Sequence, residues 1–283
     1  MLDDVLPYLR CPQCQAALRR AGPALRCAAG HAFDIARQGY VSLLPPGRRP
    51  PAGDTAAMVA ARASFLNAGH YAGLAGELAR LAAAAAADVP GCAADIGAGP
   101  GYYLAAVLGQ LPGRPGLALD VSRFALRRAA RAHPRIGAVA ADAWRRLPVA
   151  DGAAAVVVNV FAPRSGPELC RILSPRGRLL VVTPGPRHLG ELAGPLGLLA
   201  VDPRKDERLA ATLRGCFARQ ERHEYETSLH LDQAGVAAAV AMGPSAWHAD
   251  PAALAGRIGQ LPARVPVTMA VAISVFAPVA EGG

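Results

Sequence analysis

Short apolar runs alternate with longer, more polar segments through the middle of the chain. The runs predict buried strands, and the segments between them predict helices. The predicted strands lie at 92–96, 116–122, 136–141, 153–161 and 178–183, and the predicted helices between them at 102–111, 123–132 and 167–173. Continuous apolar strands separated by helices are typical of a parallel sheet that is covered on both faces. We therefore expect a doubly wound, Rossmann-like α/β sheet.

The regions on either side of this core are less regular. Residues 1–44 are turn-rich, and residues 45–54 (PPGRRPPAGD) hold four prolines, which predicts a linker or a stiff loop. Two helices follow, from about residue 55 and from about 72 to 88. The last third predicts a strand at 223–231, a helix at 233–241 and a β-rich run at 265–276. We accordingly divide the chain into a small N-terminal domain (1–44), a linker (45–54) and one large domain (55–283).

Composition places the chain among globular proteins and makes it basic. It has 283 residues, 52% of them hydrophobic, and a formal net charge of +9. The charge excess lies in residues 114–187, which hold 13 arginines against four acids. Such a region is typical of a nucleic-acid-binding face or of a solubilising surface, and charge alone leaves both open.

Neither export nor membrane insertion is indicated. The N-terminus lacks the apolar core of a signal peptide, and the alanine run at 81–87 is too short to cross a membrane. Six cysteines, three of them within the first 27 residues, indicate metal binding in a reducing compartment rather than disulfides. We expect a cytoplasmic protein with no membrane partner. The sequence leaves the oligomeric state open, a homodimer included.

Four metal-ligating side chains cluster near the N-terminus. Cys11 and Cys14 form a C-x-x-C pair that puts two thiolates on one tight turn, and Cys27 and His31 complete a Cys3His set. Four protein ligands leave no open position, which is typical of a structural zinc ion. Such an ion would stabilise a segment that is too small to fold on its own core. Four unrelated residues or a redox C-x-x-C are the alternative.

A glycine-rich turn follows the first strand of the large domain. The string Asp95-Ile-Gly97-Ala-Gly99-Pro-Gly101 stands between that strand and a helix, where glycine lets the backbone approach a ligand closely. The spacing differs from the G-x-G-x-x-G of nicotinamide-binding sites. It is similar to the signature of class I S-adenosylmethionine-dependent methyltransferases, whose ligand would lay its amino-acid end along this loop.

Two further acids lie where the same ligand would need them. Asp120 ends the next strand, where a carboxylate is able to hold both ribose hydroxyls, and Asp142 follows the third strand, where it could accept from an adenine amino group. Ordinary loop acids are the alternative. After the fifth strand, Arg187 and His188 stand at the carboxyl end of the sheet, as a ligand-binding pair or as plain surface loop.

Taken in order, these strings resemble one family, the zinc-ribbon-containing 23S rRNA (guanine-N1-)-methyltransferases. The family includes enzymes that confer resistance to tylosin-type macrolides. The resemblance covers most of residues 8–192. Beyond the cysteines it rests on GHAFDIARQGYVSLLP (30–45), ARASFLNAGHY (61–71), DIGAGPGYY (95–103), LDVS (119–122) and TPGPRHLGEL (183–192).

The resemblance implies the cofactors, the partner and the site. Zinc would be bound by the four N-terminal ligands, and the ribbon would help to dock a 23S rRNA hairpin. S-adenosylmethionine would be contacted by Tyr71, Gly101, Tyr102 and His188, with Asp120 on its ribose. Relatives often have a tyrosine at the position of Phe161, so a role that needs a hydroxyl there is in doubt, whereas stacking on a base is not.

The reaction itself sets the remaining expectations. Guanine N1 carries a proton that must leave before or while its lone pair attacks the sulfonium methyl group, so N1 and that methyl carbon must be aligned. The target base would have to leave its stack. Asn159 is a candidate for binding the guanine edge, and Phe161 or Trp144 for stacking on it, whereas no general base is identified.

Two other functions remain open at this point. One is a methyltransferase that acts on a small molecule, and the other is a zinc-ribbon RNA-binding protein without activity. The ribbon and the arginines disfavour the first, and the intact glycine loop with Asp120 disfavours the second. The methylated guanine and any resistance phenotype are not determined by the sequence. We also expect Cys11→Ser to lower zinc content and RNA binding while leaving cofactor affinity largely intact.

Overall fold

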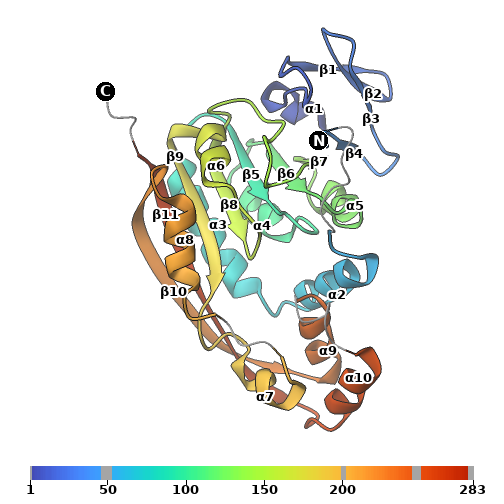
Figure 1. Cartoon of the computed structure of the whole chain (residues 1–283), viewed down its shortest axis with the longest axis vertical. Coiled ribbons are helices and arrows are strands. Elements are labelled where there is room, and N and C mark those ends of the chain that lie inside the picture. Colours follow the sequence, from blue (N-terminus) through green and yellow to red (C-terminus); the bar gives the residue numbers. More distant parts are fainter. Residues whose placement is uncertain (1, 46–52, 199–201, 244–249, 280–283) are drawn as a thin grey trace.

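A large twisted sheet with helices on both faces dominates the computed structural model, and a small three-stranded sheet lies at one end (Figure 1). The structure describes residues 2–45, 53–198, 202–243 and 250–279. The predicted linker at 45–54 therefore lies mostly outside the described residues. Within the described ranges, no helix has the length and hydropathy of a membrane-spanning segment.

Eight strands form the large sheet, in the order β10-β11-β9-β8-β5-β6-β7-β4. Their bounds are β4 Tyr40–Ser42, β5 Cys92–Ile96, β6 Gly116–Asp120, β7 Ile136–Ala140, β8 Ala154–Val160, β9 Leu173–Pro184, β10 Phe217–Leu231 and β11 Val265–Pro278. The six strands from β9 to β4 are parallel, and β11 and β10 add an antiparallel edge. The chain order reverses between β5 and β8, and the carboxyl ends of strands at such a switch point form the usual ligand crevice of this architecture.

Helices complete both faces of the sheet. The α-helices are α1 Leu2–Val5, α2 Ala56–Asn67, α3 Ala72–Ala86, α4 Tyr102–Gln110, α5 Arg123–Ala132, α6 Gly166–Ile172, α7 Ala193–Leu196, α8 Lys205–Leu213, α9 Gln233–Ala241 and α10 Pro251–Gly259, with 3-10 turns η1 Leu6–Tyr8 and η2 Gly190–Leu192. Side chains of α3, α4, α5 and α9 build the core on one face of the sheet. Side chains of α1, α6 and α8 build the core on the other face.

The N-terminal segment carries its own antiparallel sheet of β1 Leu18–Ala21, β2 Ala24–Cys27 and β3 Ala32–Asp34. Its buried side chains, among them Leu9, Leu18 and Leu25, belong to the same apolar cluster as β5 and β6 of the large sheet. The next strand, β4, pairs in parallel with β7. The segment thus packs on one face of the large sheet and supplies its outermost parallel strand.

The predicted strands and helices of residues 92–184 are confirmed, with one difference in β9. This strand begins at Leu173 rather than at residue 178, because its first part pairs with β8 across a register shift. In the last third, β10 begins at Phe217 rather than at 223. Its early residues are charged, and an exposed edge strand needs no apolar pattern to pair on one side. The sequence also missed α8 and α10.

Candidate functional site

The four N-terminal ligand residues converge, with all their ligand atoms within 4.8 Å of one another. The Cys14 and Cys27 sulfurs lie 3.7 Å apart, and His31 Nδ1 lies 3.4 Å from the sulfurs of both Cys11 and Cys27. Zn–S bonds of about 2.3 Å give a tetrahedron with edges of about 3.8 Å. The spacing therefore fits a Zn²⁺ ion bound by three thiolates and one imidazole.

Tight turns bring these ligands together. The Gln15 amide donates to the Cys11 carbonyl, and the Cys27 amide to the His31 carbonyl. Gln15 itself has φ 61°, a left-handed conformation that few non-glycine residues adopt. Its side chain also donates to the Cys11 carbonyl, at 3.2 Å. The C-x-x-C turn is thus held from both the backbone and a side chain.

The glycine loop between β5 and α4 has the conformation that its sequence predicts. Gly97, Gly99 and Gly101 all have positive φ (76°, 53° and 83°). A Cβ on Gly97 would lie 2.4 Å from the Cβ of Ala162, so only glycine fits there. The loop amides are directed inward, since Gly97 donates to the Leu119 carbonyl at 2.8 Å.

Asp120 anchors this loop to the end of β6. Its two carboxylate oxygens accept from the backbone amides of Gly99 and Ser122, both at 2.8 Å. Burial raises the pKa of Asp120, while these two hydrogen bonds act to lower it. Each oxygen keeps a further lone pair, so the carboxylate is able to accept from a ribose hydroxyl as well.

Asp95, the first residue of the glycine motif, is 1% exposed, and neither of its carboxylate oxygens has a hydrogen-bond partner among the described residues. Burial, with a smaller contribution from the charge of Asp120, raises its pKa from 3.8 to about 8. An unpaired buried carboxyl beside the glycine loop is what a ligand ammonium group would satisfy.

Replacing Asp95 should change how stability depends on pH. Its folded pKa, about 8, exceeds the ordinary 3.8, so the folded state holds this proton where the unfolded chain has lost it. The contribution to the free energy of unfolding is complete below the lower value and is lost as pH rises through the upper one. In the unaltered protein, this contribution makes the free energy of unfolding fall as pH rises. We expect Asp95→Asn to make that fall smaller, as measured by denaturant titrations from about pH 5 to pH 8. An unchanged slope would assign the pH dependence to other groups.

Asp142 occupies a turn after β7 and is 8% exposed. Its Oδ1 accepts from the Trp144 amide at 3.0 Å, and its Oδ2 lies 3.4 Å from Arg145 Nε. The carboxylate is therefore fixed at the carboxyl end of the sheet, as a contact to adenine would require.

Tyr71, Phe161 and His188 come together from distant parts of the sequence. The Phe161 and His188 rings lie 5.7 Å apart, and Tyr71 lies 6.4 Å from Phe161. The Tyr71 hydroxyl lies 3.2 Å from His188 Nε2. Burial lowers the pKa of His188 to about 4 and raises that of Tyr71, so both side chains are neutral near pH 7. The neighbouring Arg187 instead forms an exposed ion pair with Glu226.

Phe161 is the exposed member of this aromatic group, at 41%. It has φ 52°, which is unusual for a bulky residue and typical of strained functional positions. Asn159 is fully buried instead. Its amide nitrogen donates to the carbonyls of Ile96 and Pro163, and its Oδ1 accepts from Arg164 at 2.7 Å. Both polar atoms of Asn159 are thus engaged, and the side chain holds the loop that carries Phe161.

Tyr102 lies on the other side of the glycine loop. Its ring contacts that of Tyr103 edge-on at 5.3 Å and lines a groove of about 520 Å³ with residues of α2 and α3. The Tyr102 amide is one of the first N–H groups of α4, which have no intrahelical partner and are free to bind a ligand.

The sequence pattern predicts no role for Arg62, which lies in ARASFLNAGHY (61–71). It forms an ion pair with Asp54 and donates to the Met242 carbonyl at 2.8 Å. A Cβ on Gly99 would lie 3.7 Å from its Nη1, so the guanidinium lies directly over the glycine loop. Ser122 Oγ donates to the Asp54 carbonyl at 2.8 Å and thereby ties the start of α2 to the end of β6.

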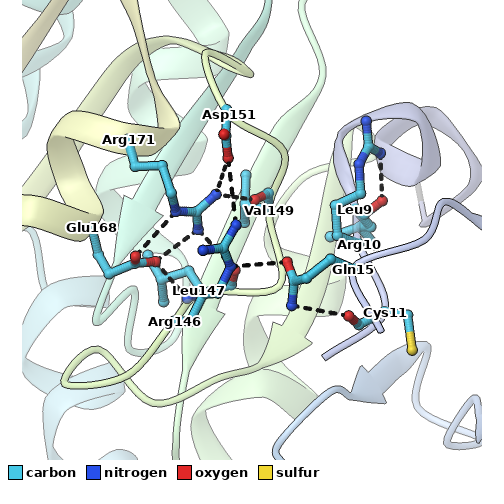
Figure 2. Close-up of polar contacts among 10 residues, drawn as sticks. All are labelled: Leu9, Arg10, Cys11, Gln15, Arg146, Leu147, Val149, Asp151, Glu168 and Arg171. Atoms are coloured by element: carbon cyan, nitrogen blue, oxygen red, sulfur yellow. Dashed lines mark hydrogen bonds and ion pairs between the residues drawn. The ribbon is translucent and has the colours of Figure 1, made fainter. Parts of the chain in front are cut away.

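The arginine excess at 114–187 is only partly a surface feature. Arg114 and Arg135 donate to carbonyls that end α3 and α4, and Arg171 holds the loop before β8 (Figure 2). By contrast, four exposed arginines of α5 have no ion pair within the described residues. They are Arg123, Arg127, Arg128 and Arg131. Part of the arginine excess is therefore structural, because the half-buried Arg114, Arg135 and Arg171 satisfy backbone carbonyl groups.

Comparisons with known proteins show which family the chain resembles. The family model described as "RlmA, N-terminal" matches residues 9–49. The chain is 52% identical, over 98% of its length and 99% of the relative's, to the 23S rRNA (guanine(748)-N(1))-methyltransferase of Streptomyces fradiae. It is 51% identical over 99% of its length to a Micromonospora griseorubida protein described as a candidate 23S rRNA (guanine-N(1)-)-methyltransferase, all of which it covers.

Among solved structures, one similar fold is a methyltransferase of Geobacter sulfurreducens in complex with S-adenosyl-L-homocysteine. It is 20% identical with a TM-score of 0.43, covering 72% of this chain and 91% of that one.

Proposed function

This chain belongs to the 23S rRNA (guanine-N(1)-)-methyltransferase family, and we propose that its target is the guanine equivalent to position 748, in a hairpin of that RNA. One observation carries the proposal: 52% identity to a relative of that stated specificity, spanning the whole chain. The class I fold with its N-terminal zinc ribbon, expected from the sequence, is confirmed, and the protein is an S-adenosylmethionine-dependent methyltransferase.

The residues around the glycine loop suit each part of this cofactor, which supplies the methyl group as an activated sulfonium. We assign its amino-acid end to the loop glycines and Asp95, whose unpaired carboxyl suits an ammonium group. The ribose goes to Asp120 and the adenine to Asp142. Tyr71 and His188 would line the methyl side, with Phe161 stacking on the extruded guanine.

The N1 proton is the remaining part of the reaction. With a pKa of about 4, His188 is too weak a base to hold that proton near pH 7. Its neutral ring, paired with Tyr71, is better suited to shape the pocket. We therefore propose that the N1 proton passes to solvent water, and that alignment of N1 with the methyl carbon provides most of the rate enhancement.

Primer extension tests the proposed target. The protein is incubated with S-adenosylmethionine and a 23S rRNA fragment that includes guanine 748, and the RNA is then reverse-transcribed. Methylation at N1 blocks the pairing edge, so we expect a stop next to that guanine and none in its guanine-to-adenosine variant. A stop at another guanine would contradict the site, and no methyl transfer to RNA would contradict the substrate.

Action on ribosomal RNA would place the protein in the cytoplasm, and tylosin tolerance of an expressing host would test the resistance that the resemblance implies.

The arginines of α5 should contribute to RNA affinity. Arg123, Arg127 and Arg131 recur every four residues on one side of the helix, where like charges repel by about 0.2–0.5 kcal/mol per pair. Bound phosphates would relieve that repulsion. We expect the double change of Arg127 and Arg131 to Ala to weaken hairpin binding and to reduce the slope of log K against log salt by roughly 0.7–0.9 per lost contact.

Arg80→Ala on α3 is the control for the single variant Arg127→Ala, which also removes one arginine, since Arg80 is exposed but paired with Glu77 at 2.7 Å. Filter binding at several salt concentrations distinguishes the two surfaces. Equal slopes for the α5 variant and the unaltered protein would remove α5 from the interface.

A further inference from the structure

Trp144 is the most exposed large apolar side chain of the described residues, at 64%. Phe161, at 41%, is the only other exposed aromatic among them. Both follow parallel strands, Trp144 after β7 and Phe161 after β8, so both lie at the carboxyl edge of the sheet. Single exposed apolar residues are common on protein surfaces, so exposure alone assigns no role.

The turn that carries Trp144 is held in place from both ends. On one side, Asp142 accepts from the Trp144 amide at 3.0 Å, and the Arg145 amide donates to the Asp142 carbonyl at 3.1 Å. On the other side, the Leu147 amide donates to Glu168 at 2.7 Å, and Arg171 donates to the Leu147 carbonyl at 3.0 Å (Figure 2). A loop fixed in this way presents the indole at a defined position.

The same turn contacts the zinc-binding segment. Arg146 Nε donates to Gln15 Oε1 at 3.1 Å, and Gln15 in turn donates to the carbonyl of the zinc-ligating residue Cys11 (Figure 2). Directly beyond it, Leu9 and Val149 form a β-bridge. Along the turn, Trp144 therefore lies between Asp142, which we assign to the cofactor, and Arg146, which contacts the zinc-binding segment.

Two arginines directly follow Trp144 in the same turn. The side chains of Arg145 and Arg146 are 42% and 54% exposed. An exposed aromatic ring beside guanidinium groups is the combination that binds unpaired nucleotides, because the ring stacks on a base and the cations attract the adjoining phosphates. A protein that reads only duplex backbone has no use for such a ring.

We infer that Trp144 stacks on an unpaired base of the RNA hairpin other than the target guanine. The inference rests on the proposed RNA substrate. Phe161, beside Tyr71 and His188, is placed for the target base, whereas Trp144 belongs to the turn that bridges the cofactor site and the ribbon. Stacking there fixes the position of the hairpin loop while one guanine enters the pocket. Trp144 is thus a positioning residue that selects RNAs with an unpaired base at the right distance from the target.

Tryptophan fluorescence gives a direct test. The only other tryptophan, Trp247, lies outside the described residues and is replaced by Phe, so the emission reports Trp144 alone. We expect the 23S rRNA hairpin to quench it, and a fully paired duplex of the same length or S-adenosylhomocysteine alone to leave it unchanged. Quenching by S-adenosylhomocysteine alone would place the indole on the cofactor adenine and overturn the inference, as would equal quenching by the duplex.

Kinetics give the second readout. Trp144→Ala should raise KM for the hairpin roughly 5- to 150-fold, with kcat changed much less, and Trp144→Phe should keep most of the affinity. An unchanged KM in Trp144→Ala, or a loss confined to kcat, would overturn the inference. Failure of the proposed function has a different signature, because the unaltered protein would then transfer no methyl group to the hairpin.

Discussion

Gly97→Ala should strongly weaken cofactor binding and, with it, methyl transfer. The added methyl group would lie 2.4 Å from the Cβ of Ala162, a separation that real Cβ atoms do not adopt. Either the glycine loop or the loop after β8 has to move, and the latter carries Phe161. Crowding of this kind costs about 1–3 kcal/mol beyond backbone strain, or roughly 5- to 150-fold in affinity. Calorimetric titration with S-adenosylhomocysteine measures the first effect, and single-turnover methylation the second.

Gly113→Ala is the matched control for that change. Gly113 has φ 74°, nearly the 76° of Gly97, but a Cβ there would meet nothing within 4 Å. In both variants an alanine has to adopt the left-handed conformation, which costs about 1–2 kcal/mol. Only the Gly97 variant adds a steric clash. Equal losses of cofactor affinity in the two proteins would mean that global destabilisation, not loop geometry, accounts for the effect. Gly99→Val should also weaken cofactor binding, because a β-branched residue is strained at φ 53° and its side chain would contact Arg62 as well as the ligand space.

The parts of the site that the sequence predicted are local in origin. The C-x-x-C turn and the glycine loop each depend on a few neighbouring residues, whose spacing alone restricts the backbone. The strand-end acids Asp120 and Asp142 follow from the apolar runs before them, since parallel strands present their carboxyl ends at one edge. These features needed no knowledge of contacts between distant segments.

The parts that the sequence missed depend on side-chain partners far away in the chain. The sequence shows Asn159 as a polar residue at a strand end, but not that its amide nitrogen and oxygen hydrogen-bond to two backbone carbonyls and to Arg164. Arg114 and Arg135 count as surface charge in a composition, but they cap helix carbonyls. The role of Arg62 appears only when α2 folds over the glycine loop. Amino-acid composition does not distinguish an exposed arginine from one that binds a carbonyl group inside the fold, because it records residue types and not their neighbours.

Removing one zinc ligand should affect more than the ribbon. Cys11 is fully buried and belongs to the apolar cluster that includes Cys92 and Ile96 of β5, the strand that leads into the glycine loop. Structural zinc in small domains contributes about 10–16 kcal/mol of apparent binding energy. We therefore expect Cys11→Ser to lose zinc, to lower the unfolding temperature of the whole protein, and to weaken S-adenosylhomocysteine binding by about tenfold or more. The sequence had favoured intact cofactor affinity, because it could not show that the two cores are continuous.

Two controls separate zinc from its surroundings. Cys216→Ser changes a partly buried thiol outside the ligand cluster and should leave zinc content unchanged. Arg146→Ala removes the hydrogen bond from the Asp142 turn to Gln15 and an ion pair with the exposed Asp151, so it should retain zinc while lowering cofactor affinity to a smaller extent. Metal analysis, thermal unfolding and calorimetry on the three variants measure their zinc content, unfolding temperature and cofactor affinity. If Cys11→Ser lost its zinc but kept both its unfolding temperature and its cofactor affinity, the ribbon would be an independent unit despite the shared core, and the coupling through the Asp142 turn would be absent.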